Sequence, residues 1–185
     1  IGGEDNNSFT IEGNELLTDN EFNTEDKQTY SILIQVEDKN GAGMTNNFTI
    51  EIVDANDPPT DITLSSASVA ELRPIGSVIG TFSTTDPDDK DPQSHNYSFV
   101  NDGGDNDNEH FSIENNKLKT ASIFDYETKS MYSIVVQTDD GKGGIFSKSF
   151  SITITDENDM PGGIVISNST IKENQPVGTV VGSFS

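Results

Sequence analysis

The sequence predicts an all-β protein made of tandem, seven-stranded Greek-key β-sandwiches. Three observations carry this prediction: the chain repeats itself, its apolar residues alternate with polar ones, and clusters of Gly, Asp, Asn and Pro separate the alternating runs. Alternation with period two is the pattern of half-buried strands. Many short strands with turn residues between them are typical of a sandwich.

The internal repeat sets the domain organisation. Residues 1–83 align with residues 103–185 without a gap, at an offset of 102, and 34 of the 83 pairs are identical. A unit of about 100 residues is large enough to own a hydrophobic core. We therefore predict that residues 1–57 are the C-terminal part of one repeat, that residues 58–159 are a complete repeat, and that residues 160–185 are the N-terminal part of the next.

The alternating runs place the strands of the complete repeat. In one run Phe150, Ile152 and Ile154 alternate with Ser and Thr. β-branched and aromatic residues dominate such runs, as they do in strands. We expect strands near residues 62–65, 77–83, 94–100, 110–113, 117–120, 130–138 and 146–155, and we expect most Phe and Tyr side chains to face the core.

Composition narrows the possible partners. The chain carries 32 Asp and Glu against 10 Lys and Arg, a formal net charge of -22 at pH 7. Such a charge argues against nucleic acid as a partner and attracts cations. There is no cysteine, which excludes disulfides and thiolate metal sites. No apolar run approaches the roughly 18–20 residues of a membrane helix, so we expect no direct membrane insertion of this segment.

Acidic residues gather at the strand ends of the predicted sandwich. They recur with the period of the repeat, most visibly in "DANDPP" at 54–59 and "DENDMP" at 156–161. Stacking repeats end to end brings the lower pole of one against the upper pole of the next. At the first junction the residues expected to converge are Glu25, Asp54, Asn56, Asp57, Asp86, Asp88 and Asp140.

A divalent cation resolves the repulsion among so many carboxylates. Calcium accepts roughly six to eight oxygen ligands in flexible geometry, whereas magnesium prefers a strict octahedron. With no Cys and only two His, softer metals fit poorly. The alternative is that the acidic loops are simply solvated. We expect His95 and His110 to lie in solvated loops.

These motifs together resemble cadherin repeats, particularly the long bacterial cadherin-like arrays, and the resemblance spans the whole chain. Glu71 in "VAEL" and Glu173 in "KEN" match the basal Glu of the family. "DPD" (86–88) matches its DxD, "DYE" (125–127) its DxE, and the two linkers its DxNDxxP. Asp38 and Asp140 match the acid after the sixth strand.

The resemblance implies an Ig-like, cadherin-like sandwich with up to three calcium ions at each junction. It assigns the first junction the seven residues already given. It assigns the second junction a set from the complete repeat: Glu71, Asp125, Glu127, Asp156, Asn158 and Asp159. The first repeat departs from the family, because Asn23 replaces the first acid of DxE. The DxD partner of the second junction falls beyond residue 185, so we expect the first junction to hold calcium better.

The leading hypothesis for function is a calcium-rigidified spacer or adhesive segment of a large secreted or cell-surface protein. Its partners are then the neighbouring repeats and another protein or glycan on a cell surface. A calcium-dependent carbohydrate-binding module is the alternative, although the chain has no Trp. We do not expect an enzyme, because stacked sandwiches offer little cleft for separated acid and base. The incomplete repeats at both ends are completed either by further sequence or by strands of another chain.

Overall fold

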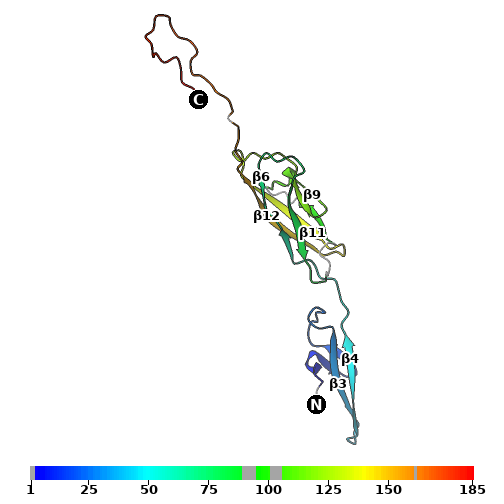
Figure 1. The fold of residues 1–185 in the computed structure, drawn as a ribbon. Helices are drawn as coiled ribbons and strands as arrows, with labels where there is room; N and C mark the ends of the chain where they lie inside the picture. Colours follow the sequence, from blue (N-terminus) through cyan, green and yellow to red (C-terminus); the bar gives the residue numbers. More distant parts are fainter. Residues whose placement is uncertain (1–2, 89–94, 101–105, 161) are drawn as a thin grey trace.

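The computed structural model describes residues 3–88, 95–100, 106–160 and 162–185. These form an elongated chain with an N-terminal unit at one end, a β-sandwich in the middle and an extended C-terminal segment at the other end (Figure 1). The all-β fold is confirmed, since only two short 3-10 helices interrupt the strands among the described residues. Within those residues, no helix is long and apolar enough to cross a membrane.

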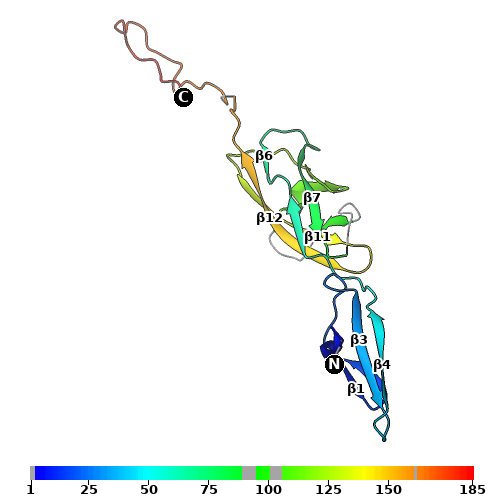
Figure 2. The same cartoon turned by 60° about the horizontal axis from the view of Figure 1, so that its bottom comes forward.

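The middle unit is a sandwich of two four-stranded sheets. One sheet has the order β5 (Asp61–Leu64), β7 (Val78–Thr85), β10 (Lys117–Thr120), β9 (Phe111–Glu114). The other has the order β6 (Ser68–Ala70), β12 (Ile145–Thr155), β11 (Met131–Asp139), β8 (Asn96–Phe99). All pairings are antiparallel except that of β6 with β12. Figure 2 shows the two layers from a second side.

The strands follow the alternating pattern closely, with one addition. Each expected strand is present within a few residues, although residue 94 at the expected start of β8 lies outside the described residues. β6, with the sequence "SVA", was not expected. It forms because the chain leaves the first sheet after β5 and joins β12 in the second sheet.

The core of the sandwich comes from the inward positions of both sheets. Its fully buried members include Ile62 and Phe82 from one sheet and Ile134 and Ile152 from the other. Burying each such side chain stabilises the fold by about 1.5–3 kcal/mol. Phe111, Phe124 and Tyr132 add edge-to-face and tilted ring contacts at centroid distances of 4.8–5.9 Å. The expected assignment of aromatic residues to the core therefore holds in the sandwich.

The N-terminal unit reproduces the later half of the sandwich. It contains η1 (Asn6–Ser8), β1 (Phe9–Glu12), β2 (Glu15–Thr18), β3 (Thr29–Glu37) and β4 (Gly43–Glu51). Its elements match η2 (Asn108–His110) and β9 to β12 at the offset of 102. The hairpin turns match as well, since Gly13 (φ 64°) and Asn115 (φ 56°) both adopt the left-handed conformation that a two-residue turn needs.

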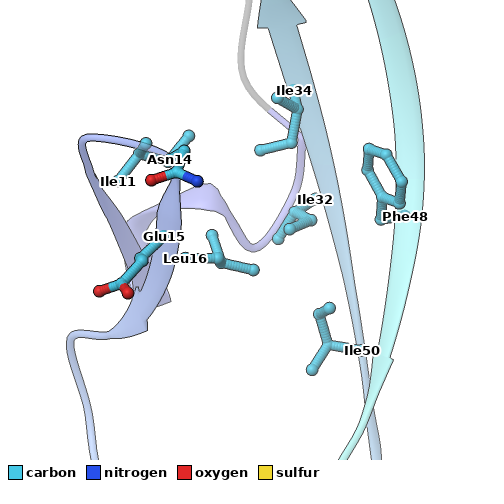
Figure 3. Close-up of a pocket in the computed structure, with 8 residues that line it drawn as sticks. All are labelled: Ile11, Asn14, Glu15, Leu16, Ile32, Ile34, Phe48 and Ile50. Atoms are coloured by element: carbon cyan, nitrogen blue, oxygen red, sulfur yellow. The ribbon is translucent and has the colours of Figure 1, made fainter.

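The inner face of this unit is open. A groove of about 350 Å3 separates the β1–β2 hairpin from the β3–β4 hairpin, and its walls are mainly apolar. Figure 3 shows Leu16 pointing across the groove toward Ile32, with Phe48 and Ile50 on the far wall. In the sandwich, β5 and β7 complete the corresponding core.

The segment after residue 161 has little regular structure. A single antiparallel bridge joins Ile166 to Phe184, and backbone hydrogen bonds join Val165 to Ser185. These residues correspond to β5 and β7 at the offset of 102. Their large side chains are exposed, 82% for Ile164 and 74% for Phe184. The two ends of the segment therefore pair with each other, but their apolar side chains are not buried in a core.

Candidate metal centre

Three carboxylates from distant parts of the sequence meet between the N-terminal unit and the sandwich. Glu25 lies in the loop between β2 and β3, Asp57 in the linker after β4, and Asp88 after β7. Each offers an oxygen, and these oxygens all lie within 4.8 Å of one another. We call these residues the first cluster. All three belong to the set expected at the first junction.

Asp57 and Asp88 are also joined directly. The backbone N–H of Asp57 donates to Asp88 Oδ2 at 2.5 Å. Asp88 Oδ1 is buried and has no hydrogen-bond partner among the described residues. A buried carboxylate oxygen without a donor is costly, and a cation is a natural partner for it.

The electrostatics of Asp57 show how concentrated the charge is. Burial raises the pKa of its carboxyl, and the negative charges of nearby carboxylates raise it further. The carboxylates responsible are Asp88, Glu25, Asp54 and Asp86. Every one of them was expected at this junction. Proton uptake is one way to relieve this repulsion, and cation binding is the other.

Asp54 lies beside the first cluster and is held by a residue that the sequence did not single out. Thr24 donates its hydroxyl to Asp54 Oδ1 at 2.7 Å. Asn23, the departure from the DxE pattern, accepts the backbone N–H of Glu25 with its side-chain Oδ1 at 2.7 Å. Asn23 therefore fixes the turn that presents Glu25 without adding a charge.

Asp140, in the loop between β11 and β12, is tied to the linker. Asn56 donates its side-chain N–H to Asp140 Oδ2 at 2.9 Å. Asp140 Oδ1 accepts the backbone N–H groups of Lys142 and Gly144. The Asn56 bond and these backbone bonds lower the pKa of the Asp140 carboxyl. The linker passes so close that a Cβ on Gly144 would lie 2.8 Å from Pro58 Cα, so only glycine fits there without a shift.

The surroundings of Asp86, the first acid of "DPD", show that the expectation of a solvated His95 was wrong. His95 is 7% exposed rather than solvated, and its Nε2 lies 3.0 Å from Asp86 Oδ2. Asp86 Oδ1 accepts the backbone N–H of Asp88 at 3.0 Å. The expectation failed because the side chain of His95, the residue directly before β8, packs against Asp86 at the pole of the sandwich. His110 is partly buried as well, with Nδ1 3.0 Å from Ser122 Oγ.

A second cluster lies at the opposite pole of the sandwich. It consists of Glu71, Glu127 and Asp156, whose oxygens lie within 4.8 Å of one another. Glu71 follows β6 and is 1% exposed. Its two oxygens accept the backbone N–H groups of Tyr126 (2.7 Å) and Glu157 (2.9 Å), so it joins two loops of this pole.

The remaining residues expected at the second junction lie in the same two segments of the chain as Glu127 and Asp156. A hydrogen bond from its own backbone N–H lowers the pKa of Glu127, but burial and the charges of Glu71, Asp159 and Asp156 outweigh it, so the pKa is raised. Asp125 Oδ1 accepts the backbone N–H of Thr128 at 3.0 Å. Asn158 donates its side-chain N–H to the backbone oxygen of Asp159 at 3.2 Å.

Both clusters offer the ligands of a hard cation. Their donors are carboxylate oxygens, and the chain has no cysteine to supply a thiolate. The first cluster draws its donors from two units of the chain, whereas the second draws all of its donors from the sandwich. Hard oxygen donors with flexible spacing suit calcium. The orphan oxygen of Asp88 fits such an ion.

Comparison with known proteins shows similarity to the cadherin family. The family model of the cadherin domain matches residues 65–155. Protocadherin Fat 4 of Mus musculus is 32% identical over 165 residues, which cover 85% of this chain and 3% of that protein. Cadherin-1 of Gallus gallus is 31% identical over 172 residues, which cover 84% of this chain and 19% of that protein. The chain thus spans a small part of each relative. The narrower likeness to bacterial arrays stays a prediction.

Solved structures agree with the fold. A structure of protocadherin gammaB7 (EC3-6) superposes with a TM-score of 0.62 at 25% identity and covers 98% of this chain and 46% of that chain. The extracellular cadherin domains 1-5 of protocadherin Gamma B2 give a TM-score of 0.66 at 23% identity and cover 91% of this chain and 34% of that chain. The sandwich architecture predicted from the sequence is therefore confirmed.

Proposed function

Because residues 65–155 of this chain are a cadherin domain, we propose that the chain is a calcium-binding segment of a large extracellular protein. In this role it separates or presents adhesive surfaces, and calcium at the junctions between repeats sets its stiffness. The cadherin family is a non-enzymatic adhesion family, and we propose no catalytic activity for this segment.

The observation that carries the proposal is the first cluster. It joins Glu25 of one unit, Asp57 of the linker and Asp88 of the next unit within 4.8 Å. Bound calcium would neutralise these charges and use the orphan oxygen of Asp88. Because the three donors belong to three segments, fixing their oxygens fixes the segments relative to one another.

Around these three donors the chain supplies further oxygens and fixes their orientation. Asp54, Asn56, Asp86 and Asp140 complete the proposed set for the first junction, as the resemblance to cadherin repeats implies. Thr24 orients Asp54, and Asn56 joins the linker to Asp140. Both are hydrogen bonds between side chains of the protein. They restrict the motion of the metal-binding side chains before calcium binds, so less conformational entropy is lost on binding.

We propose a second site at the pole formed by Glu71, Glu127 and Asp156, with Asp125, Asn158 and Asp159 around it. Its donors within this chain come from the sandwich alone. We therefore expect the first junction to bind calcium more tightly than the second in the chain of 185 residues. A neighbouring repeat that brings a DxD motif would complete the second site.

Small-angle X-ray scattering with calcium and then with a chelator tests this function. With calcium the junction stiffens, so the maximum dimension reaches a defined value; with chelator the carboxylates repel and the distribution of dimensions broadens. Extracellular modules bind calcium at roughly 0.1–1 mM. At about 100 times the dissociation constant, binding stabilises the folded chain by about 2.7 kcal/mol, which raises the melting temperature.

Magnesium at the same concentration is the control for ionic strength and for divalent charge. Magnesium has little effect on the scattering curve or the melting temperature if the clusters require the flexible coordination of calcium. A chain whose scattering curve and melting temperature are the same in calcium, magnesium and chelator would disprove the proposed function.

A further inference from the structure

The contact between His95 and Asp86 has a consequence for the first cluster. Both side chains are almost fully buried, with exposures of 1% for His95 and 3% for Asp86. Asp86 follows β7 in one sheet, and His95 precedes β8 in the other. The hydrogen bond of 3.0 Å between them therefore joins the two sheets at the pole that carries the first cluster.

The contact is the outermost layer of a polar ladder between the sheets. Two residues further inside along each strand, Thr84 Oγ1 lies 2.9 Å from the hydroxyl of Tyr97. Thr84 also lies 2.9 Å from Thr138 Oγ1 on β11. Since side chains two positions apart on a strand share a face, Asp86 and His95 extend this ladder from the core to the pole.

From Asp86 a chain of hydrogen bonds leads to the linker. Asp86 Oδ1 accepts the backbone N–H of Asp88 at 3.0 Å, and Asp88 Oδ2 accepts the backbone N–H of Asp57. His95 thus fixes one oxygen of Asp86, and the other oxygen of Asp86 fixes the backbone of Asp88. The orientation of two first-cluster carboxylates depends on this path.

We infer that His95 is a positioning residue for the first calcium site: it donates Nε2–H to Asp86 and thereby holds the Asp86–Asp88 turn in its binding conformation. This inference rests on the proposed function. An ionised carboxylate only accepts hydrogen bonds, so Nε2 must carry the proton. Partners that orient metal-binding carboxylates typically contribute about 10- to 100-fold to metal affinity.

Two substitutions at position 95 separate positioning from packing. His95→Phe keeps a planar ring of similar volume and removes the donor, whereas His95→Gln keeps a terminal N–H donor and removes the ring. If His95 positions Asp86, calcium affinity falls about ten-fold or more in His95→Phe and recovers in His95→Gln. If His95 only fills space, the order of the two variants is reversed and the inference is overturned.

Calorimetric titration with calcium chloride measures these affinities. The variants are made in the full chain with Glu127→Gln and Asp156→Asn, which remove two carboxylates of the second cluster and leave one junction to titrate. Tyr97→Phe is the matched control. It deletes the next contact of the same ladder, so it lowers the melting temperature and leaves calcium affinity unchanged.

Nitrogen-15 NMR of the histidine rings tests the same inference in the unmodified chain, so it does not depend on whether a variant folds. Protonated Nε2 on His95, with and without calcium, is the expected result, and a bare Nε2 overturns the inference. If the unmodified chain binds no calcium, the proposed function falls and this inference falls with it. If it binds calcium and His95→Phe binds equally well, only the role of His95 is refuted.

Discussion

Asn56 donates its side-chain N–H to Asp140 at 2.9 Å, so a direct hydrogen bond joins the linker to the β11–β12 loop of the sandwich. This bond lowers the pKa of Asp140, whereas burial and nearby carboxylates raise the pKa of the adjacent linker residue Asp57. Protonation of these two carboxylates therefore has opposite effects on the stability of the folded chain: it is favourable at Asp57 and unfavourable at Asp140.

The first prediction concerns pH. Asp57 has a folded pKa above its ordinary value of 3.8, so protonation favours the folded state. Calcium-free stability therefore rises as the pH falls through the raised pKa toward 3.8, and calcium affinity falls over the same window. Asp140 has a folded pKa below 3.8, so the stability that it contributes is present above that value and is lost as the pH falls through the lowered pKa.

Thermal melts and calcium titrations at about pH 7 and about pH 4 measure the two effects expected of Asp57, the gain in calcium-free stability and the loss of calcium affinity. Asp57→Asn is the control, because the amide cannot titrate and this part of the pH dependence disappears. Calcium-free stability that declines steadily between these two pH values contradicts the prediction for Asp57. Glu127, whose pKa is also raised, adds a contribution of the same sign from the second cluster.

The second prediction separates repulsion from binding. Asp57→Asn removes one charge from a cluster of three carboxylates within 4.8 Å. In chelator the variant melts at a higher temperature than the unmodified chain, because repulsion is reduced. In calcium its affinity is roughly ten-fold lower, because ligand charge sets the strength of such sites. Asp19→Asn, an exposed site outside both clusters, leaves both quantities unchanged.

The repeat explains why so much of the fold could be predicted from the sequence. β3 and β11 share an alternating pattern at an offset of 102, and both pair with the next strand in the same register, with Tyr30 opposite Ile50 and Tyr132 opposite Ile152. The topology also led to the expectation that Glu25, Asp57 and Asp88 converge at one junction, and their carboxylate oxygens lie within 4.8 Å of one another.

What the sequence could not show depends on the path of individual loops. His95 begins the alternation that continues at Tyr97 and Phe99, but its polar ring beside an acidic loop was interpreted as solvated, and only its contact with Asp86 shows why it is buried. β6 has only three residues, and its position depends on a switch between sheets that no local pattern reports. The bond from Thr24 to Asp54 joins residues 30 positions apart and depends on how the linker leaves β4.

The third prediction uses a strained backbone position. Leu72 has φ of 57°, a left-handed conformation that is unfavourable for a residue with a branched apolar side chain, and it follows the buried Glu71. The equivalent residue of the next repeat, Asn174, has φ of 65°. Asn tolerates this region better, so Leu72→Asn stabilises the sandwich by about 0.5–1 kcal/mol.

Urea denaturation of the chain with chelator measures this change. Leu72 is 55% exposed, so its replacement leaves no cavity. Leu72→Val is the opposing control, because a β-branched residue fits this conformation less well and destabilises the sandwich. Equal midpoints for all three chains contradict the assignment of strain.

The fourth prediction compares two equivalent leucines. Leu118 in the sandwich is 0% exposed, whereas Leu16 in the N-terminal unit is 41% exposed. Leu118→Ala removes a side chain from a closed core and destabilises the sandwich by about 2–5 kcal/mol. Leu16→Ala removes a side chain that lines an open groove and has a much smaller effect. Denaturation curves for the two variants give the contrast, and equal losses contradict it.

The last prediction concerns self-association. In the sandwich, Ile62 and Phe82 of β5 and β7 are buried against the core. Their equivalents Ile164 and Phe184 are exposed, and the matching groove in the N-terminal unit is open. Because the segment and the groove repeat a pairing that the sandwich already makes, we expect residues 162–185 of one copy to pack on the N-terminal unit of another.

Multi-angle light scattering across a concentration series measures this association, which buries apolar area and strengthens as concentration rises. Phe184→Ser weakens it, because the side chain equivalent to Phe82 is lost. Val53→Ser is the control, since Val53 is 83% exposed and does not line the groove. A chain that stays monomeric at every concentration rules out this pairing. Association that Phe184→Ser leaves unchanged also contradicts this pairing, because the loss of the Phe184 side chain should weaken it.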